Sequence, residues 1–153
     1  MKFQTLTLSI LAALAFSVES LAESADPTSG LQSAPHNVWG IWLNPKGTAK
    51  IEITDCADTS PCGQIIWVTH EGNENPLDNN NPDPDLAKRP LTGVKMLHSF
   101  RRGKSKWSNG KIYNPEDGKS YKASIKAKMD GTLEVKGCVG PFCKTQIWTR
   151  PAP

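Results

Sequence analysis

The chain has 153 residues, a formal net charge of +3 and 22% charged residues. A nucleic-acid-binding domain of this length carries a denser basic face, and the one basic cluster, 101–106, is more typical of a solvated turn. We therefore expect a single domain with no nucleic-acid partner.

The N-terminal segment has the features of an export signal. After a positive start, an apolar run at 6–18 is shorter than the roughly 20 residues that a membrane span needs. Ser20 and Ala22 place small residues three and one positions before a cut, which predicts cleavage after Ala22. We predict a signal peptide at 1–22, a flexible leader at 23–36 and a domain at 37–153 in a periplasmic or secreted protein. A retained membrane anchor is the alternative.

Eight strand-like runs follow the leader, separated by residues that favour turns. The clearest run is 119–129, in which apolar residues alternate with lysines and a serine, as in a strand with one buried face. Outside the signal, no segment sustains the 3.6-residue period of a helix. The sequence therefore predicts an all-β domain, with strands within 38–43, 49–54, 63–70, 93–101, 106–113, 119–129, 132–138 and 143–150.

Eight short antiparallel strands in series leave unpaired edges unless the sheet closes on itself. An eight-stranded antiparallel up-and-down barrel removes those edges. Such a barrel can hold one small ligand or fill entirely with side chains. A β-sandwich of the same strands is the alternative, because the order of strands in space does not follow from the pattern.

The four cysteines form two short pairs, Cys56 with Cys62 and Cys138 with Cys143, each bracketing a turn. In an up-and-down barrel the two pairs lie at opposite ends, and a disulfide requires Cα atoms within about 7 Å. We therefore predict one disulfide within each pair and no four-cysteine zinc site. Disulfides of this kind are typical of an oxidising compartment.

Several motifs occur in order between 38 and 150. They are Trp39-Gly40-Ile41-Trp42, Arg89-Pro90-Leu91-Thr92-Gly93, Ile112-Tyr113-Asn114-Pro115, Gly118-Lys119-Ser120-Tyr121 and Gln146-Ile147-Trp148-Thr149-Arg150. In these motifs the chain resembles the DUF2147 domain, a family of small exported bacterial proteins without an assigned activity. The resemblance implies a lipocalin-like barrel that can hold a small apolar molecule, and it implies no catalytic residue.

Gly40-Ile41-Trp42 and Arg150 also resemble the lipocalin pattern, in which a tryptophan closes the barrel floor beneath an arginine. A guanidinium over an indole contributes about 0.5 to 2 kcal/mol, depending on its exposure. The resemblance implies structural roles for Trp42 and Arg150.

In the fourth run, alternate residues from 94 to 100 share a face whose apolar weight predicts that it points inward. That placement would bury His98, either as a core histidine with a hydrogen-bond partner or as the polar anchor of a ligand. The predicted pocket has apolar, adaptable walls. Its predicted lining residues are Met96, His98, Tyr121, Ile125 and Met129.

The longest connection, 71–92, is unusual for so small a domain and is expected to be a lid, a binding loop or flexible filler at the barrel mouth. An EF-hand frame starting at Asp78 would place Asp83 at the turn glycine and Arg89 at the bidentate glutamate, which argues against calcium. Arg89 either binds an anionic head group or pairs with an aspartate of the loop.

No Gly-x-Ser-x-Gly elbow is present in the chain, and Ser108-Asn109-Gly110-Lys111 matches Ser-x-x-Lys without its companion motifs. We expect a non-catalytic binder of a small apolar or amphipathic envelope molecule, although an enzyme remains an open alternative. A second hypothesis is a filled barrel that contacts an envelope protein or polysaccharide through its loops. We expect no cofactor, no metal and no stable membrane insertion.

Overall fold

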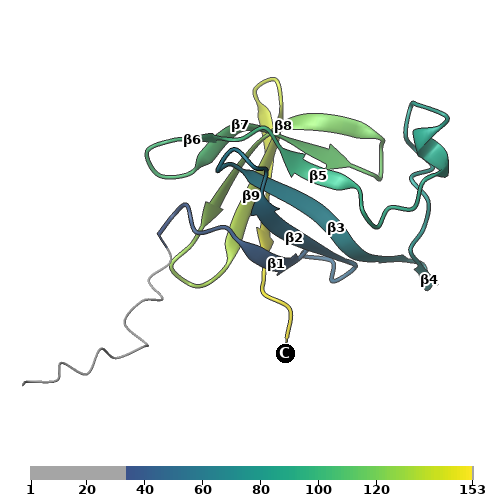
Figure 1. Ribbon diagram of the computed structural model, residues 1–153, viewed down its shortest axis with the longest axis horizontal. Coiled ribbons are helices and arrows are strands. Elements are labelled where there is room, and N and C mark those ends of the chain that lie inside the picture. Colours follow the sequence, from purple (N-terminus) through teal and green to yellow (C-terminus); the bar gives the residue numbers. More distant parts are fainter. Residues whose placement is uncertain (1–33, 153) are drawn as a thin grey trace, which may run out of the picture.

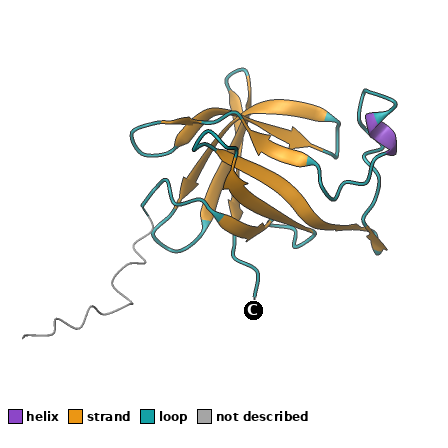
Figure 2. Ribbon diagram, in the orientation of Figure 1, coloured by secondary structure: helices purple, strands orange, loops and turns teal. Residues whose placement is uncertain are grey.

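We describe residues 34–152 of the protein from a computed structural model. The predicted signal peptide, its cleavage after Ala22 and most of the leader lie outside the described residues. Each of the eight predicted runs contains a strand (Figures 1 and 2). The strands are β1 Gly40–Leu43, β2 Ala49–Asp55, β3 Pro61–His70, β4 Asn73–Glu74, β5 Lys95–His98, β6 Arg101–Arg102, β7 Trp107–Asn114, β8 Lys119–Ala127, β9 Leu133–Val139 and β10 Phe142–Trp148.

Eight of these strands form an antiparallel sheet in the order β1-β2-β3-β5-β7-β8-β9-β10. The two-residue strands β4 and β6 pair with β3 and β7. The sheet curls into a half-barrel that closes at one bridge, between Leu43 of β1 and Thr149 directly after β10 (Figure 1). The Leu43 amide donates to the Thr149 carbonyl at 2.8 Å, and the Leu43 carbonyl accepts from the Thr149 amide at 3.1 Å. The predicted all-β, up-and-down, lipocalin-like architecture is confirmed.

The interior of the half-barrel is packed with apolar side chains. Trp42 of β1 and Trp148 at the end of β10 are both almost fully buried, and the Trp42 indole N–H donates to the Val38 carbonyl at 2.8 Å. In β8 the predicted alternation holds from Ala123 to Ala127, where the inward residues are buried. The strand ends at Ala127, so Met129 lies in the following turn.

The predicted inward placement of Met129 is therefore wrong, because its side chain is 86% exposed.

The inward placement of His98 is also wrong. Gly63 and Gln64, adjacent in β3, pair with Leu97 and Lys95, so β5 contains one residue more than its partner. Such a bulge shifts the alternation locally, because the extra residue moves the side chains next to it to the other face. Leu97 is consequently the fully buried residue, and His98 lies beside Lys111 with Nδ1 2.8 Å from the Ser99 hydroxyl oxygen.

Both predicted disulfides are confirmed. The Cα atoms are 5.1 Å apart in Cys56–Cys62 and 4.0 Å apart in Cys138–Cys143. Cys138 and Cys143 lie directly opposite each other in the β9–β10 hairpin, whereas Cys56 and Cys62 flank the β2–β3 turn at the other end of the barrel.

Residues 34–36, the end of the predicted flexible leader, pack against the barrel. The Pro35 carbonyl accepts from the Ala127 amide at 3.1 Å. The His36 carbonyl accepts from the Trp107 indole N–H at 3.0 Å, and His36 Nε2 lies 2.8 Å from the Gly103 carbonyl oxygen. These residues therefore pack on the barrel beside the start of β7 and the end of β8 rather than remaining loose.

Candidate functional site

A cavity of about 490 Å³ opens on the inner side of β7, β8, β9 and β10. It lies at the end of the barrel that carries the β7–β8 and β9–β10 turns. Apolar side chains form much of its wall, and polar and charged side chains stand around them. The lining residues are Met96, Ile112, Asn114, Glu116, Asp117, Tyr121, Val135, Gly137, Val139, Phe142, Cys143, Lys144 and Gln146.

Small residues and a missing neighbour strand create this space. Gly137 of β9 lies between Ala123 of β8 and Lys144 of β10, so two of three adjacent inward positions contribute little volume. A Cβ placed on Gly137 would have Ile112 as its nearest contact, at 3.4 Å. In the described part of the chain, β10 meets β1 only at Thr149, which leaves the rest of its length without a second partner strand.

The charged residues of the rim differ in their partners. Glu116 forms an ion pair with Lys46, and Asp117 accepts hydrogen bonds from the Tyr121 hydroxyl and, at 3.1 Å, from the Lys119 amide. Partial desolvation raises the pKa of Asp117, but these hydrogen bonds outweigh it and hold the pKa below its usual value.

The same contact with Asp117 raises the pKa of the Tyr121 hydroxyl. Within residues 34–152 no ion pair involves Lys144, which is exposed on the β10 wall. An anionic group entering the cavity would therefore meet Lys144 as its available cation.

Of the six predicted ligand-binding residues, the structure places Met96 and Tyr121 in the cavity wall. Ile125 is fully buried in the core. His98 lies on the outer side of β5, where partial burial, then Lys111 and Lys95, lower its pKa. Met129 is in the turn at the opposite end of the barrel.

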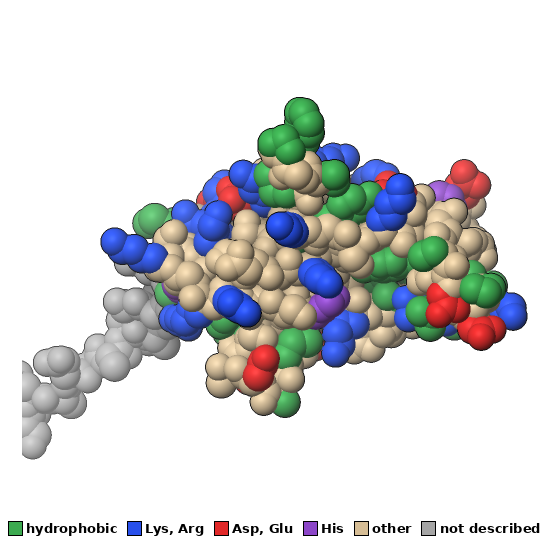
Figure 3. Space-filling model, turned by 90° about the horizontal axis from the view of Figure 1, so that it is seen from above, with side chains coloured by type: hydrophobic (Ala, Val, Ile, Leu, Met, Phe, Trp, Pro, Cys, Tyr) green, Lys and Arg blue, Asp and Glu red, His purple; other side chains and the backbone are tan. Residues whose placement is uncertain are grey.

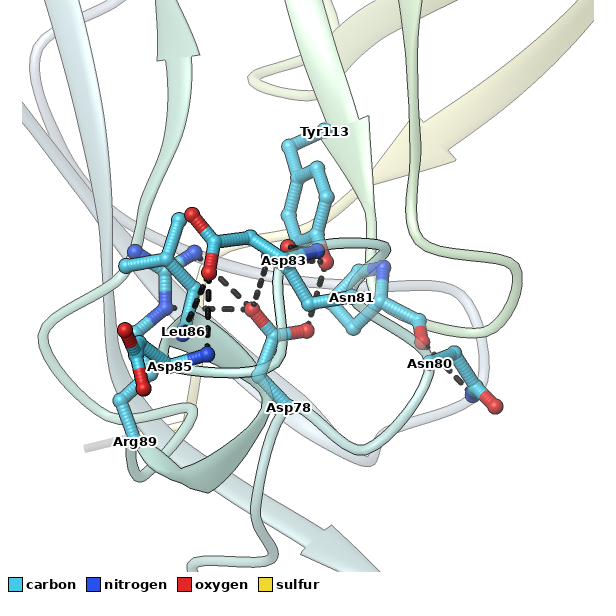
Figure 4. A network of polar contacts seen from close by, with 9 residues as sticks. Asp78, Asn80, Asn81, Asp83, Asp85, Leu86, Arg89 and Tyr113 are labelled. Carbon is cyan, nitrogen blue, oxygen red and sulfur yellow. Dashed lines mark hydrogen bonds and ion pairs between the residues drawn. The ribbon is translucent and has the colours of Figure 1, made fainter.

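The sixth predicted residue, Arg89, belongs to the long loop instead. Its Nε and Nη2 atoms donate to one carboxylate oxygen of Asp78, at 3.1 and 2.9 Å. The other oxygen accepts from the Tyr113 hydroxyl at 2.6 Å, and Asn81 donates to Asp78 at 2.9 Å (Figure 4). Asp78 is fully buried, so Arg89 neutralises a carboxylate inside the protein.

This network shows that the loop is fixed to the outer side of the barrel. Tyr113 follows the inward-facing Ile112 in β7 and so points to the opposite face, where the loop covers it. Burial, followed by its hydrogen bond to Asp78, raises the pKa of Tyr113 to about 12. A 3₁₀ turn, Leu86–Lys88, is the one helical element in the described residues (Figure 2).

The loop also positions the rim of the cavity. Asn80 donates from its amide nitrogen to the carbonyls of Pro115 and Glu116, at 3.0 and 3.2 Å. Gly118 has a φ of +67°, and a Cβ at this position would lie 1.8 Å from the Asn80 carbonyl oxygen. Only glycine fits both that conformation and that approach. The loop thus sets the β7–β8 turn without itself lining the cavity.

At the opposite end of the barrel, Arg150 caps Trp42. The guanidinium carbon lies 3.6 Å from the centroid of the Trp42 ring. Its nitrogens donate to the carbonyls of Ile41 and Trp39, at 3.1 and 2.8 Å. Gly40 leaves room for this group, since a Cβ there would lie 2.7 Å from an Arg150 nitrogen.

Sequence reasoning missed the β10 side of the cavity. Phe142, Lys144 and Gln146 share the face of the buried Trp148, and this two-residue period was the available signal. Residues 34–152 contain no group of three or more histidine, cysteine or acidic side chains arranged to hold a metal. Within the same residues no helix has the length and apolar character to cross a membrane.

Comparisons with known proteins agree with this architecture. A solved structure, described as protein HP1028 from the human pathogen Helicobacter pylori, which belongs to the lipocalin family, is 26% identical to the chain with a TM-score of 0.64. The match covers 78% of this chain and 84% of that one. No curated protein matches the chain. A family model described as an uncharacterized protein conserved in bacteria, DUF2147, matches residues 40–150, and the chain therefore belongs to the DUF2147 family.

Proposed function

We propose that this protein binds a small apolar or amphipathic molecule in the cavity between β7 and β10. The main observation in support is the cavity itself. Its volume of about 490 Å³ lies within the range of about 300 to 1,000 Å³ that is usual for small-molecule sites. Its apolar wall suits a hydrocarbon body, and the polar rim suits a head group. The lipocalin-like fold supports a binding role.

The second hypothesis, a filled barrel that works only through its loops, accounts for part of the interior. The packed half around Trp42 and Trp148 fits that hypothesis. The cavity at the other end does not fit it, so we favour the binding protein. Two disulfides are consistent with export, and we propose a periplasmic or secreted location with cleavage after Ala22.

The first test is native mass spectrometry of the protein purified from an oxidising periplasm, followed by the same sample denatured. A carried ligand appears as an additional mass of a few hundred daltons, on the order of a drug-sized molecule, that is lost on denaturation. The denatured mass also reports the cleavage site and the oxidation of the four cysteines. If the native mass equals the mass of the protein alone, the protein carries no ligand after purification, and binding is then tested with added probes.

Filling the cavity tests the site directly. Gly137→Met should reduce the affinity for an environment-sensitive fluorescent lipid probe by about tenfold or more, because the new side chain occupies the space beside Ile112. Lys136→Met is the matched control, since it adds the same side chain on the outer face of the same strand. Equal loss in both variants, or none in Gly137→Met, would contradict the proposed site.

A further inference from the structure

We propose that the tip of the β9–β10 hairpin inserts into the surface of an anionic phospholipid bilayer. Val139 and Phe142 pair directly across the hairpin and are 60% and 80% exposed. Gly140 and Pro141 form the two-residue turn between them. The β9–β10 hairpin projects beyond the rest of the sheet in Figure 1, and Figure 3 shows hydrophobic side chains at the surface with lysine and arginine side chains close to them.

The backbone of the tip suits an apolar medium. Unpaired backbone donors and acceptors are costly in lipid, and a two-residue turn leaves few of them. Pro141 has no amide hydrogen, and the Gly140 φ of +54° permits the tight reversal. The Cys138–Cys143 disulfide joins the residue pair adjacent to Val139 and Phe142, so the tip is already ordered before it contacts a bilayer.

The charges around the tip complement an anionic surface. Lys119 and Lys122 are exposed and border a shallow depression that reaches Val139 and Gly140 of the hairpin. Lys144 is exposed on the inner side. The acidic residues of the neighbouring turn already have partners, Lys46 and Tyr121. Each lysine close to an anionic bilayer strengthens binding by about fivefold.

A bilayer fits this tip better than a protein partner does. A stable protein interface buries about 800 Å² on each side, far more than two apolar side chains and a turn can supply. A lipid surface requires no complementary shape. Since Val139 and Phe142 also belong to the cavity rim, insertion would bring the cavity opening to the lipid interface. The inference itself does not require the cavity to be occupied.

Vesicle flotation tests the apolar part of the tip. The mass of each purified variant is measured first, and only preparations with the same N terminus are compared. Each is then mixed with phosphatidylcholine vesicles that contain or lack phosphatidylglycerol. We expect the wild-type protein to float with the anionic vesicles, and Phe142→Ser to weaken that binding by about tenfold. Met129→Ser is the control, because Met129 is 86% exposed at the opposite end of the barrel. Thermal unfolding checks that each variant is folded.

Substitution of the lysines tests the charged part and separates it from the cavity. The double variant Lys119→Gln/Lys122→Gln should lose about fivefold per lysine on anionic vesicles, whereas Lys104→Gln should not. Neither Lys119 nor Lys122 lines the cavity, so the double variant should bind the lipid probe in solution as the wild type does.

The inference is overturned if the wild-type protein does not float, if Phe142→Ser floats equally well, or if Phe142→Ser disrupts only a complex with an envelope protein. Failure of Gly137→Met to reduce probe binding would instead remove the proposed cavity function and leave the flotation result standing.

Discussion

Arg150 joins the last described residues of the chain to the segment around β1. It stacks on Trp42 and donates to two carbonyl oxygens, although part of its side chain remains exposed. We expect Arg150→Ala to lower the free energy of unfolding by about 1 to 2 kcal/mol, because the cation–π contact and two charge-assisted hydrogen bonds are lost. Urea titration followed by tryptophan fluorescence measures the change.

Arg102→Ala is the matched control for that substitution. Arg102 also lies over a tryptophan ring, but its guanidinium carbon is 5.6 Å from the centroid of Trp107. This contact is longer, so the expected loss is about 0.5 kcal/mol or less. Similar losses in the two variants would show that the contacts with β1 add nothing to stability.

Tyr113 makes stability depend on pH in the alkaline range. Its pKa is about 12 in the folded protein and about 10 in an unfolded chain. Because the folded pKa is raised, this contribution is complete below pH 10 and is lost as the pH rises towards 12. The urea midpoint of the wild type should therefore fall more steeply between these pH values than that of Tyr113→Phe.

The pKa itself can be measured in a Tyr121→Phe variant. The chain has two tyrosines, so this variant retains Tyr113 alone, and the absorbance of tyrosinate reports its ionisation. A pKa close to 10 in the folded protein, or parallel slopes for the wild type and Tyr113→Phe, would contradict the role given to the buried contact with Asp78.

At the scale of elements, the two disulfides close hairpins of similar length at opposite ends of the barrel, with sequence separations of 6 and 5 residues. Loop-closure entropy predicts that each contributes about 2 kcal/mol to stability. Only the Cys138–Cys143 hairpin borders the cavity. Replacing that pair with serine should weaken both stability and probe affinity, whereas replacing Cys56 and Cys62 should weaken stability alone.

Probe titration and urea unfolding of the two double variants measure these effects. Unchanged probe affinity in Cys138→Ser/Cys143→Ser, at a reduced stability, would show that the rim does not need the crosslink.

The strands themselves were largely predictable, and the places where the prediction failed have local causes. Alternation correctly indicates the buried face of β8 up to Ala127, because that strand pairs with β9 without a register shift. It fails at His98, because the bulge in β5 depends on its pairing with β3, which the pattern of β5 alone does not contain. The turn-favouring residues that follow this run also did not indicate that β8 ends at Ala127, before Met129.

For the whole molecule, topology and disulfide pairing followed from the sequence, but the cavity only in part. Met96 and Tyr121 were identified, whereas Gly137 was not, since a glycine contributes space only in relation to the side chains around it. The long loop was expected to be a lid, a binding loop or filler. Its burial of Asp78 against Tyr113 and Arg89 depends on contacts between distant segments, which composition does not specify.

The single bridge between Leu43 and Thr149 has a kinetic consequence. In the eight-stranded sheet every other contact between neighbouring strands joins one strand to the next of these strands along the chain. The bridge instead joins residues 43 and 149, which are 106 residues apart. Loop-closure entropy favours formation of the hairpins first and of the bridge afterwards. A contact absent from the transition state affects unfolding rather than folding. Loss of the Arg150 cap should thus shorten the lifetime of the folded protein while leaving its rate of refolding nearly unchanged.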